Sequence, residues 1–342
     1  MNFYVDQDIS IAKSLDSSFY LNDKYYSLSI EKIFKKSWQF IGHKSEFINN
    51  RINPITILKN SVNEPVVLTK KDDDYSFLSN VCTHRGHIIN QKKCNSKTMK
   101  CLYHGRAFDL SGKMLNMPGF KNVKNFPSEE DNLIKLPSFD WADFLFTGIN
   151  PKIDINSVIM DFKSRLANYP LSKLKYNPKL SRTYRLDANW ALYCENYLEG
   201  LHVPFVHKGL NGDIDIKSYQ TELLDNGVLQ YTNDKSDDLY AYYYWIFPNM
   251  MFNFYDWGLS VNLVEPISAN QTRIKFLSYS LKDDIKTKTK VDELHEVELE
   301  DEEVVLNVQN GIQSQFYNNG RYSADYEKGT HHFHRLICKY LK

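Results

Sequence analysis

The sequence lacks several features that would assign it to common protein classes. It has no run approaching the roughly 18 apolar residues that a membrane-spanning helix needs. Its first residues, MNFYVDQDIS, include acids but no apolar stretch of the kind found in secretory signals. Lys plus Arg and Asp plus Glu both total 42, so no net charge attracts nucleic acid or an anionic membrane. We therefore expect a cytoplasmic protein that binds neither nucleic acid nor membranes.

Cysteine is also scarce. The 342 residues include five cysteines, an odd number in a long chain that carries no sign of secretion. Disulfides persist mainly in oxidising compartments, so metal ligands, or thiols without a special role, are the better interpretation here. The positions of the cysteines relative to histidines and acids then decide which of them bind metal.

Residue composition divides the chain into three parts. Residues 24–37 are predicted to form a short amphipathic helix. Short runs of β-branched and aromatic residues separated by polar turns follow, which is the pattern of a small all-β module. The second half mixes further strands with two predicted helices, at about 188–202 and 290–310, and this indicates an α+β domain dominated by an antiparallel sheet. The predicted parts are a helical segment that packs on the last domain, the all-β module and the α+β domain: 1–37, 38–150 and 151–342.

The all-β module contains two Cys–His pairs. They are Cys82-x-His84 and Cys101-x-x-His104, with residues 85–100 between them. A zinc finger typically takes two cysteines from one knuckle and two histidines from a later segment, whereas here each segment offers one of each. This arrangement favours a [2Fe-2S] cluster in which two thiolates hold one iron and two imidazoles the other; a structural zinc site is the alternative. Neutral imidazoles raise the reduction potential to roughly −150 to +300 mV, against about −400 mV for plant ferredoxins.

A second group of residues capable of binding metal lies in the α+β half. Glu199 and His202 are three residues apart and would be neighbours on one face of a helix. His207 would not share that face, but Pro204 disfavours helical geometry before it and is predicted to break the helix just after His202. His207 can then fold back toward the same point. Two imidazoles and one carboxylate form a facial triad that holds iron with open coordination positions, although two histidines at this spacing also occur without a metal.

Eight acids in VDELHEVELEDEEVVLNVQNGI compete for the role of the third ligand. At 100° per residue, six apolar residues fall within about 60° of Asp301 on a helix. These are Leu294, Val297, Val304, Val305, Val308 and Ile312. Asp301 therefore lies in the middle of an apolar stripe, whereas three other acids point away: Glu300, Glu302 and Glu303. A carboxylate in a core is costly unless it is charge-paired or metal-bound, so Asp301 is the predicted ligand and Glu298, at the edge of the stripe, is the alternative.

Together these motifs resemble the α (catalytic) subunit of the Rieske non-haem iron ring-hydroxylating oxygenases, over nearly the whole chain. CTHRGH and CLYHGRAFDLSGK match the two cluster-binding loops of that family, NW–EN–E–H–H matches its iron segment, and VQNGIQSQFY–GRYS–EKG–HHFH resembles its C-terminal segment. The resemblance implies an α+β protein with an all-β Rieske [2Fe-2S] domain and a helix-grip (START-like) antiparallel-sheet catalytic domain. The implied cluster ligands are Cys82, His84, Cys101 and His104. The implied ligands of the mononuclear iron are His202, His207 and Asp301.

The resemblance also implies an assembly and two further site residues. Family members are typically homotrimers, some with a second subunit, in which the cluster of one chain feeds the iron of its neighbour. An acid three residues before the first iron histidine bridges the two centres. Here that acid is Glu199, between His202 and His104 of the next chain, and Asn196 matches an asparagine near the iron. Many aromatic dioxygenases have Asp at the bridging position, whereas the Glu resembles choline, betaine and carnitine monooxygenases.

The implied activity is that of a terminal oxygenase. It would use O2 and electrons to hydroxylate a small organic substrate, such as a quaternary amine, at a mononuclear Fe(II). The electrons would come from NAD(P)H through a separate reductase, with or without a ferredoxin. The chain itself has neither the G-x-G-x-x-G fingerprint nor the cysteine spacing of a plant-type ferredoxin. An aromatic-ring oxygenase of the same family, and a non-catalytic ligand-binding module with a Rieske electron-transfer domain, are the alternatives. The choice between mono- and dioxygenation stays open.

Other residues in these segments have more than one interpretation. The stretch YAYYYWIFPNMMFNFYDWG offers an aromatic cage for a trimethylammonium group, but alternating aromatics also build strands and core. The cage candidates are Tyr240, Tyr243, Trp245, Phe247, Phe252, Phe254 and Trp257. Cys94 is predicted to be a bystander and His87 either a support of the cluster or an ordinary loop residue, while the sequence gives Cys194 no role. Three histidines in HHFH are predicted to serve packing and subunit contacts and not to bind metal: His331, His332 and His334.

Overall fold

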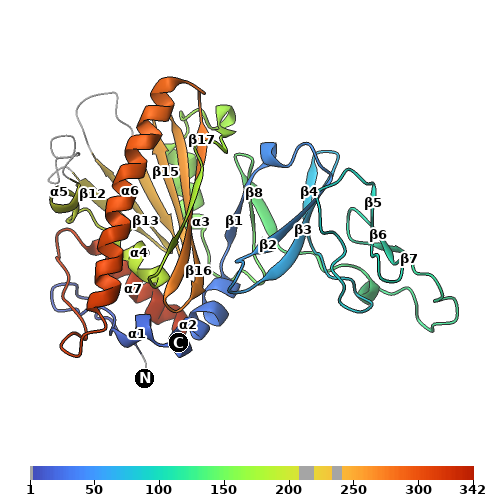
Figure 1. Ribbon diagram of the computed structural model, residues 1–342, viewed down its shortest axis with the longest axis horizontal. Helices are drawn as coiled ribbons and strands as arrows, with labels where there is room; N and C mark the ends of the chain where they lie inside the picture. The colour runs from blue at the N-terminus through green and yellow to red at the C-terminus, as the bar shows by residue number, and fades with distance from the viewer. Residues whose placement is uncertain (1–2, 208–218, 233–240) are drawn as a thin grey trace. The chain divides into compact units, whose positions relative to one another are not determined.

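The computed structural model describes residues 3–207, 219–232 and 241–342, and the chain divides into two compact units (Figure 1). One unit is Trp38–Pro151, and the other combines Met1–Ser37 with Lys152–Lys342. The N-terminal segment thus belongs to the same unit as the C-terminal half of the chain. Within the described residues, no helix combines the length and the apolar character needed to cross a bilayer.

The unit Trp38–Pro151 is built from short antiparallel strands, in agreement with the predicted all-β module. Its strands form three-stranded sheets in the orders β1-β9-β8, β2-β3-β4 and β5-β6-β7. The strands are β1 (Gln39–His43), β2 (Ile52–Ile57), β3 (Glu64–Lys71), β4 (Asp74–Ser79), β5 (Thr98–Lys100), β6 (Ala107–Asp109), β7 (Met114–Asn116), β8 (Ser138–Trp141) and β9 (Phe144–Thr147). Short 3-10 helices join some of them: η2 (Lys44–Glu46) and η3 (Glu129–Asp131).

Both cysteines of the Cys–His pairs belong to the hydrophobic core of this unit. Cys82 follows β4 and Cys101 follows β5, and both pack among fully buried side chains such as Val67, Leu78 and Phe108. Alternation along the strands explains this placement, because every second residue of a short antiparallel strand faces the core. The strands therefore carry the two Cys–His loops on a packed base.

The larger unit is built on an eight-stranded antiparallel sheet. Its order is β10-β17-β16-β15-β14-β13-β12, and β11 also pairs with β17. The strands are β10 (Lys175–Tyr176), β11 (Arg182–Leu186), β12 (Tyr219–Leu224), β13 (Gly227–Thr232), β14 (Tyr242–Ile246), β15 (Met250–Tyr255), β16 (Gly258–Ser268) and β17 (Gln271–Ser280). The antiparallel sheet predicted for the second half is therefore confirmed.

The larger unit also contains helices. They are α1 (Ser18–Leu21), α2 (Asp23–Lys32), α3 (Asn156–Arg165), α4 (Trp190–Tyr197), α5 (Val203–Val206), α6 (Ile285–Gly311) and α7 (Lys328–Leu341), with 3-10 turns η1 (Phe34–Lys36) and η4 (Leu171–Lys173). Figure 1 shows the long helix α6 running across one face. On the opposite face, Phe162 of α3 packs against Tyr244, Phe252 and Phe254. The sheet thus separates an α3 side from an α6 side.

The helix predicted at 188–202 is shorter in the structure. It ends at Tyr197, and a separate turn, α5, begins at Val203. Pro204 lies in the first turn of α5, where its missing N–H costs nothing, and so it does not break a longer helix. Glu199 and His202 therefore lie in the connection between the two helices. The predicted helix 290–310 is present and starts earlier, at Ile285.

Candidate functional site

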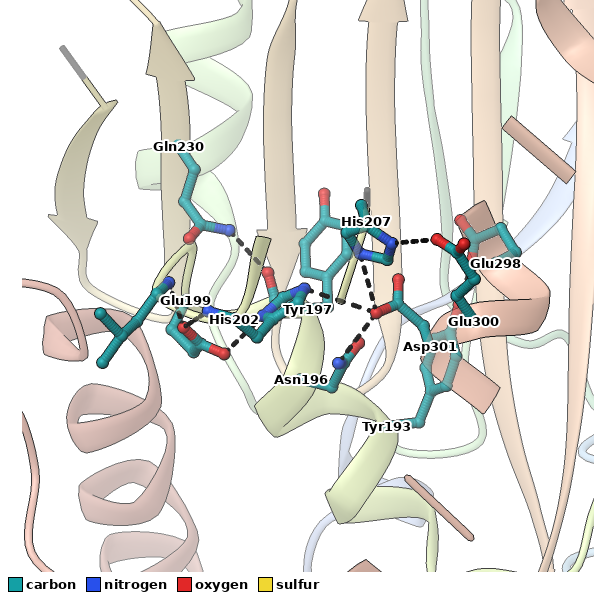
Figure 2. A network of polar contacts seen from close by, with 11 residues as sticks. Tyr193, Asn196, Tyr197, Glu199, His202, His207, Gln230, Glu298, Glu300 and Asp301 are labelled. Atoms are coloured by element: carbon teal, nitrogen blue, oxygen red, sulfur yellow. Dashed lines mark hydrogen bonds and ion pairs between the residues drawn. The ribbon is translucent and has the colours of Figure 1, made fainter. Parts of the chain in front are cut away.

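Two histidines and one aspartate lie close enough to share a metal ion. One ligand atom from each of His202, His207 and Asp301 lies within 4.8 Å of the others. Among the described residues, this is the one group of three such side chains close enough to hold a metal ion. Nε2 of His202 is 3.4 Å, and Nε2 of His207 3.2 Å, from Oδ1 of Asp301. Figure 2 shows the two histidine rings beside the Asp301 carboxylate. The ring centroids are 5.3 Å apart. The structure brings the three predicted iron ligands together and leaves Glu298 outside the group.

Side-chain hydrogen bonds hold α4 and α6 in register around these ligands. The side chain of Asn189 caps α4, and its backbone N–H donates to Oε1 of Gln309 at 2.8 Å. About two turns further along α4, Nδ2 of Asn196 donates to Oδ1 of Asp301 at 3.0 Å. Gln309 and Asp301 are also about two turns apart on α6, so the two helices run antiparallel and are joined at two levels. Asn196 therefore orients the Asp301 carboxylate.

Each histidine is held at its other ring nitrogen by a carboxylate. Nδ1 of His202 is 2.6 Å from Oε1 of Glu199, and Nδ1 of His207 is 2.7 Å from Oε2 of Glu300. When Nδ1–H donates to these carboxylates, the neutral ring presents its lone pair at Nε2, on the side of Asp301. Such support from behind is typical of histidines that bind metal. Glu300 lies off the apolar stripe and is exposed, as predicted, but its carboxylate reaches back to His207.

The charges around the three ligands favour a bound cation. Burial alone would lower the pKa of His202, but hydrogen bonds with Asp301 and Glu199 raise it to about 9. Burial alone would raise the pKa of Asp301, but the two histidines lower it to about 2. The pKa of His207 is raised against the effect of burial, through Asp301 and Glu300. The pKa shifts thus favour positive charge beside an ionised Asp301, which is the charge that a bound cation would supply. Two imidazoles with one carboxylate are the ligand set of non-haem iron(II).

Two other acids of α6 are partly buried nearby. Burial raises the pKa of Glu298 to about 8, and the hydroxyl of Tyr193 donates a hydrogen bond to its Oε2. Burial raises the pKa of Glu302 to about 7, and its Oε1 is enclosed without a hydrogen-bond partner in the part of the chain that the structure describes. The prediction that Glu302 points away from the core is thus wrong.

A cavity extends from the ligands between α6 and the sheet. Its inner part, the inner cavity, is lined by the ligands and by tyrosines of α4 and the strands: Tyr193, Tyr197, Tyr219, Tyr243 and Tyr255. A second hollow, the outer cavity, adjoins it. Asn253, Tyr255, Leu294 and Glu298 line both parts. A small molecule bound in the outer cavity would therefore reach the ligands through the inner one.

The predicted aromatic cage divides between the cavity and the core. Tyr243 lines the inner cavity and Trp257 the outer one. Four other candidates are fully buried and take part in core packing: Trp245, Phe247, Phe252 and Phe254. For these four, the alternative interpretation as strand and core residues is correct. Tyr240 lies outside the described residues.

The two Cys–His loops of the smaller unit share a pattern of backbone hydrogen bonds. The N–H of Gly86 donates to the carbonyl of Cys82, and the N–H of Gly105 donates to the carbonyl of Cys101. Each cysteine N–H in turn donates to the carbonyl of the residue five positions later. Gly86 and Gly105 have φ values of 68° and 75°, in the left-handed region that favours glycine. Each loop therefore makes the same tight turn around its cysteine.

The four side chains of these loops fit the donor set of a Rieske cluster. Cys82 and Cys101 are 3% and 2% exposed, and burial raises the pKa of the Cys82 thiol. The rings of His84 and His104 lie 4.7 Å apart between centroids. Nδ1 of His84 is buried and finds no hydrogen-bond partner among the described residues. Two buried sulfurs and two facing imidazoles, one with an unpartnered nitrogen, suit a cluster with two thiolate and two imidazole ligands.

Arg106 joins the two loops, and the sequence did not single it out. It is 2% exposed and follows directly after the second loop. Its Nη1 donates to Oγ1 of Thr83 in the first loop at 2.7 Å, and its Nη2 to Oδ1 of Asp131 at 3.1 Å. A buried arginine needs such partners, because an unpaired buried charge is costly. Glu300 and Arg106 were missed for the same reason: each acts through a contact that is distant in sequence.

The remaining cysteines and histidines occupy less specialised positions. Cys94 is exposed and pairs through its backbone with Ile52. Burial raises the pKa of the Cys194 thiol, which contacts the carbonyl of Pro248. Nδ1 of His87 is buried without a hydrogen-bond partner among the described residues. The HHFH histidines lie on α7 and make packing and polar contacts within the larger unit: His331, His332 and His334.

Two protein-family models match the chain. Residues 37–127 match the Rieske [2Fe-2S] domain. Residues 174–223 and 214–342 match the catalytic domain of the ring hydroxylating alpha subunit. The first match covers the two Cys–His loops, and the second covers the two histidines and the aspartate. The matches therefore fall on the same two units that carry the candidate metal centres.

Characterised relatives cover nearly all of the chain. A chloroplastic choline monooxygenase of Arabidopsis thaliana is 28% identical over 364 residues, which covers 97% of this chain and 83% of that protein. The carnitine monooxygenase oxygenase subunit of Escherichia coli K12 is 26% identical and covers 97% and 94%. Among solved structures, the quaternary ammonium Rieske monooxygenase CntA in complex with L-carnitine gives a TM-score of 0.83 at 23% identity, over 98% and 97% of the two chains. Naphthalene 1,2-dioxygenase gives 0.69 at 16%, over 96% and 92%.

Proposed function

The chain belongs to the Rieske non-haem iron ring-hydroxylating oxygenases, as an α (catalytic) subunit, and we propose that it hydroxylates a small quaternary amine. It is a terminal oxygenase, which takes electrons from a separate reductase and consumes O2. The observation that carries the proposal is the convergence of His202, His207 and Asp301 at the end of a tyrosine-lined cavity. The tyrosine ring faces suit a cationic substrate, because cations bind aromatic faces.

In this proposal the chain's own residues divide the work between two centres. Cys82, His84, Cys101 and His104 would hold the [2Fe-2S] cluster, and the triad of the larger unit would hold the ferrous ion. When bound, the cluster supplies single electrons and the ferrous ion supplies open positions at which O2 is activated. Glu300 orients His207, and Asn196 orients the carboxylate of Asp301. The cavity would place the substrate beside the triad.

The substrate class is proposed from the cavity and from the relatives together. Two relatives that match nearly the whole chain are named choline monooxygenase and carnitine monooxygenase. Choline and carnitine are both quaternary amines. The cavity offers tyrosines together with an acid, Glu298, in addition to Glu199 and Asp301. Glu199 occupies the position at which aromatic dioxygenases often have an aspartate. These features favour a quaternary amine over an aromatic hydrocarbon.

We also propose a homotrimer in which electrons pass between chains. Glu199 accepts the Nδ1–H of His202 and is partly exposed, so it can also face a neighbouring subunit. Beside the cluster ligand His104, Leu102 and Tyr103 are 81% and 56% exposed, which is unusual for apolar side chains next to a metal centre. A neighbour's Glu199 would bridge the two centres. A cytoplasmic location is part of the proposal, and cell fractionation would test it.

A single-turnover experiment tests the activity without the reductase. The protein is reduced with dithionite under argon, freed of reductant and mixed with O2 and one candidate substrate. Products are identified by mass spectrometry, with choline, glycine betaine, carnitine and benzoate as candidates. An oxygenated product from a quaternary amine, absent with His207→Ala, is expected. Product from benzoate alone would indicate an aromatic-ring oxygenase. Ligand binding without any oxygenated product would indicate a binding module.

Mixed trimers test the electron path. Cys101→Ser removes the cluster from one chain and His207→Ala removes the iron from another. Each variant alone is inactive. If electrons pass between chains, co-expression restores part of the activity, because some trimers then contain an intact cluster next to an intact iron. No restoration in trimers that contain both variants would contradict transfer between chains.

A further inference from the structure

The smaller unit buries one charged side chain whose charge its fold does not require. In Trp38–Pro151, a unit that the structure describes throughout, Arg106 is the one Lys, Arg, Asp or Glu that is buried, at 2% exposed. A guanidinium keeps its proton in proteins, so this positive charge is permanent. Burial of a charge is costly, and a neutral or apolar side chain often fills such a position at no loss of stability. The charge itself therefore needs an explanation.

Arg106 lies between the two loops that carry the cluster ligands. Its Nη1 donates to Oγ1 of Thr83 at 2.7 Å, and Thr83 is the residue between Cys82 and His84. Its backbone carbonyl accepts the N–H of Cys101 at 2.8 Å. The side chain thus reaches the first loop while the backbone belongs to the second. A permanent positive charge is therefore fixed beside the ligands from both loops.

Aromatic rings surround the guanidinium on its way to a cluster ligand. Cζ of Arg106 lies 5.6 Å from the ring centroid of Phe120 and 5.4 Å from that of Phe126. Phe120 also meets the ring of His84 edge to face, with centroids 5.4 Å apart. The guanidinium carbon is thus no further from the His84 ring centroid than the sum of the two Phe120 distances, 11.0 Å. Apolar rings lower the local dielectric, so the charge acts more strongly here than at the surface.

An aspartate offsets this charge only in part. Nη2 of Arg106 donates to Oδ1 of Asp131 at 3.1 Å, and the backbone N–H of Ser128 holds the other carboxylate oxygen at 2.8 Å. The side chain of Asp131 is 18% exposed and that of Arg106 is 2% exposed. Water therefore screens the acid more than the guanidinium. Nε of Arg106 is also enclosed, with no hydrogen-bond partner in the described part of the chain. The pair leaves net positive charge on the side of the cluster ligands.

We propose that Arg106 raises the reduction potential of the Rieske cluster and that Asp131 limits the rise. Reduction adds one electron, taken from the separate reductase, and no bond forms or breaks. The added negative charge is stabilised by a fixed positive charge nearby, and net charge and burial are two of the means by which a protein shifts such a potential. The inference rests on the cluster, which the family match and the four ligands support, and is independent of the substrate.

The potential is measured directly, without substrate or turnover. Cluster-loaded protein is titrated with dithionite and redox mediators at fixed pH and ionic strength, and the EPR signal of the reduced cluster is followed. At an effective dielectric constant of about 20, a unit charge roughly 10 Å away changes an equilibrium constant by about tenfold. Arg106→Gln is therefore expected to lower the constant for one-electron reduction about tenfold, or by about 59 mV. Arg106→Lys keeps the charge and should recover most of this loss.

A second variant reverses the sign. Asp131→Asn removes the negative partner and is expected to raise the reduction constant, by about threefold because this carboxylate is better screened. A residue that only held the loops together would not shift the potential upward when its partner is neutralised. Lys100→Gln is the matched control, since Lys100 precedes Cys101 and carries the same charge on an exposed side chain. Its effect should be much smaller than that of Arg106→Gln.

The outcomes separate an electrostatic role from a structural one. An unchanged potential in Arg106→Gln protein that retains the complete cluster would overturn the inference, and so would a lower potential in Asp131→Asn. If Arg106→Gln does not retain the cluster, Asp131→Asn decides, and an unchanged or lower potential contradicts the proposal. A shift for Lys100→Gln as large as that for Arg106→Gln would also contradict it, because burial would then be irrelevant. None of these results alters the product analysis that tests the proposed function.

Discussion

The two candidate metal centres are held in contrasting ways. The four cluster ligands lie between Cys82 and His104, on two loops whose backbone hydrogen bonds are equivalent. The iron ligands extend from His202 to Asp301: the two histidines flank α5, and Asp301 lies on α6. Their orientation depends on side chains behind them: Glu199, Glu300 and Asn196. One site is fixed mainly by the backbone and the other mainly by side chains.

This difference has a consequence for each centre. A backbone frame holds ligands rigidly, which suits a cluster that only gains and loses electrons. Where side chains orient the iron ligands, a substitution can change the orientation of one ligand, because each supporting side chain can be replaced without altering the fold. Substitution of a residue that supports one metal centre should therefore leave the other centre intact.

Removal of a ligand should have the largest effect and should separate the centres completely. His207→Ala is expected to abolish iron binding in the larger unit and all turnover, while the EPR signal of the reduced cluster persists. Cys101→Ser is expected to abolish the cluster and turnover while ferrous iron still binds at the triad. Metal analysis and EPR on both variants check this. Loss of both metals in either variant would show that the centres are not independent.

Glu199→Gln should break the link between the centres. The amide keeps the size of the side chain but removes the negative charge that accepts from Nδ1 of His202. With ferrous iron supplied in excess both metals should remain bound, while the rate of cluster oxidation by O2 in the presence of substrate falls by about 100-fold. Rapid-mixing absorbance of the reduced cluster measures this rate. Normal rates in the variant would contradict the bridging role.

Glu195→Gln is the control for that measurement. Glu195 is on the same segment, but it accepts a hydrogen bond from Tyr20 and lies 3.0 Å from His334. Its loss should lower thermal stability and leave the cluster oxidation rate of the folded protein unchanged.

Substitution of a supporting side chain should have an intermediate effect, limited to the iron. Glu300→Gln and Asn196→Ala each remove one contact that orients a ligand. Each is expected to weaken ferrous iron binding about 10- to 100-fold, the usual range for residues that support a metal ligand. Iron titration of the cluster-loaded protein checks this, with Glu303→Gln as the exposed control on the same helix. An equal change in cluster content would contradict the separation of the two sites.

A change in the backbone frame should have the smallest effect and should act on the cluster unit alone. Gly86 has φ of 68° and no atom within 4 Å of an added Cβ, so Gly86→Ala introduces backbone strain without a steric clash. It is expected to cost about 1–2 kcal/mol in unfolding free energy. Gly311→Ala also meets no atom within 4 Å, but Gly311 ends α6 and is not among the positive-φ glycines, so the substitution should not destabilise. Denaturant unfolding of both variants compares them.

The sequence predicts the backbone-held site better than the side-chain-held one. The cluster ligands lie in two short motifs whose spacing is sufficient to propose the cluster. Asp301 was proposed from helical periodicity alone, because an acid in an apolar stripe needs a partner. The antiparallel sheet and the all-β unit also followed from local patterns. These features depend on residues that are close together in the sequence, and motif spacing and periodicity record such local relations.

The features that were missed depend on distant contacts. Glu300 was placed on the outer face of α6, but its long side chain reaches His207, 93 residues away in the sequence. Glu302 was also assigned to solvent, although other elements cover it. The length of α4 was overestimated because the end of the helix was assigned from Pro204, whereas Gly200, which disfavours a helix, lies earlier in the turn at 198–202. The tyrosines of the cavity were mixed with core aromatics, since strand alternation gives two faces without indicating which one meets α6.

The central claim is that one chain holds two independent iron centres, and a metal count tests it most directly. Iron and acid-labile sulfide are measured per chain in protein purified without oxygen, together with an EPR spectrum after chemical reduction. The predicted result is three irons and two sulfides with a Rieske-type signal, and two irons and two sulfides in His207→Ala. Zinc without sulfide, or a full iron count that His207→Ala does not change, would contradict the account.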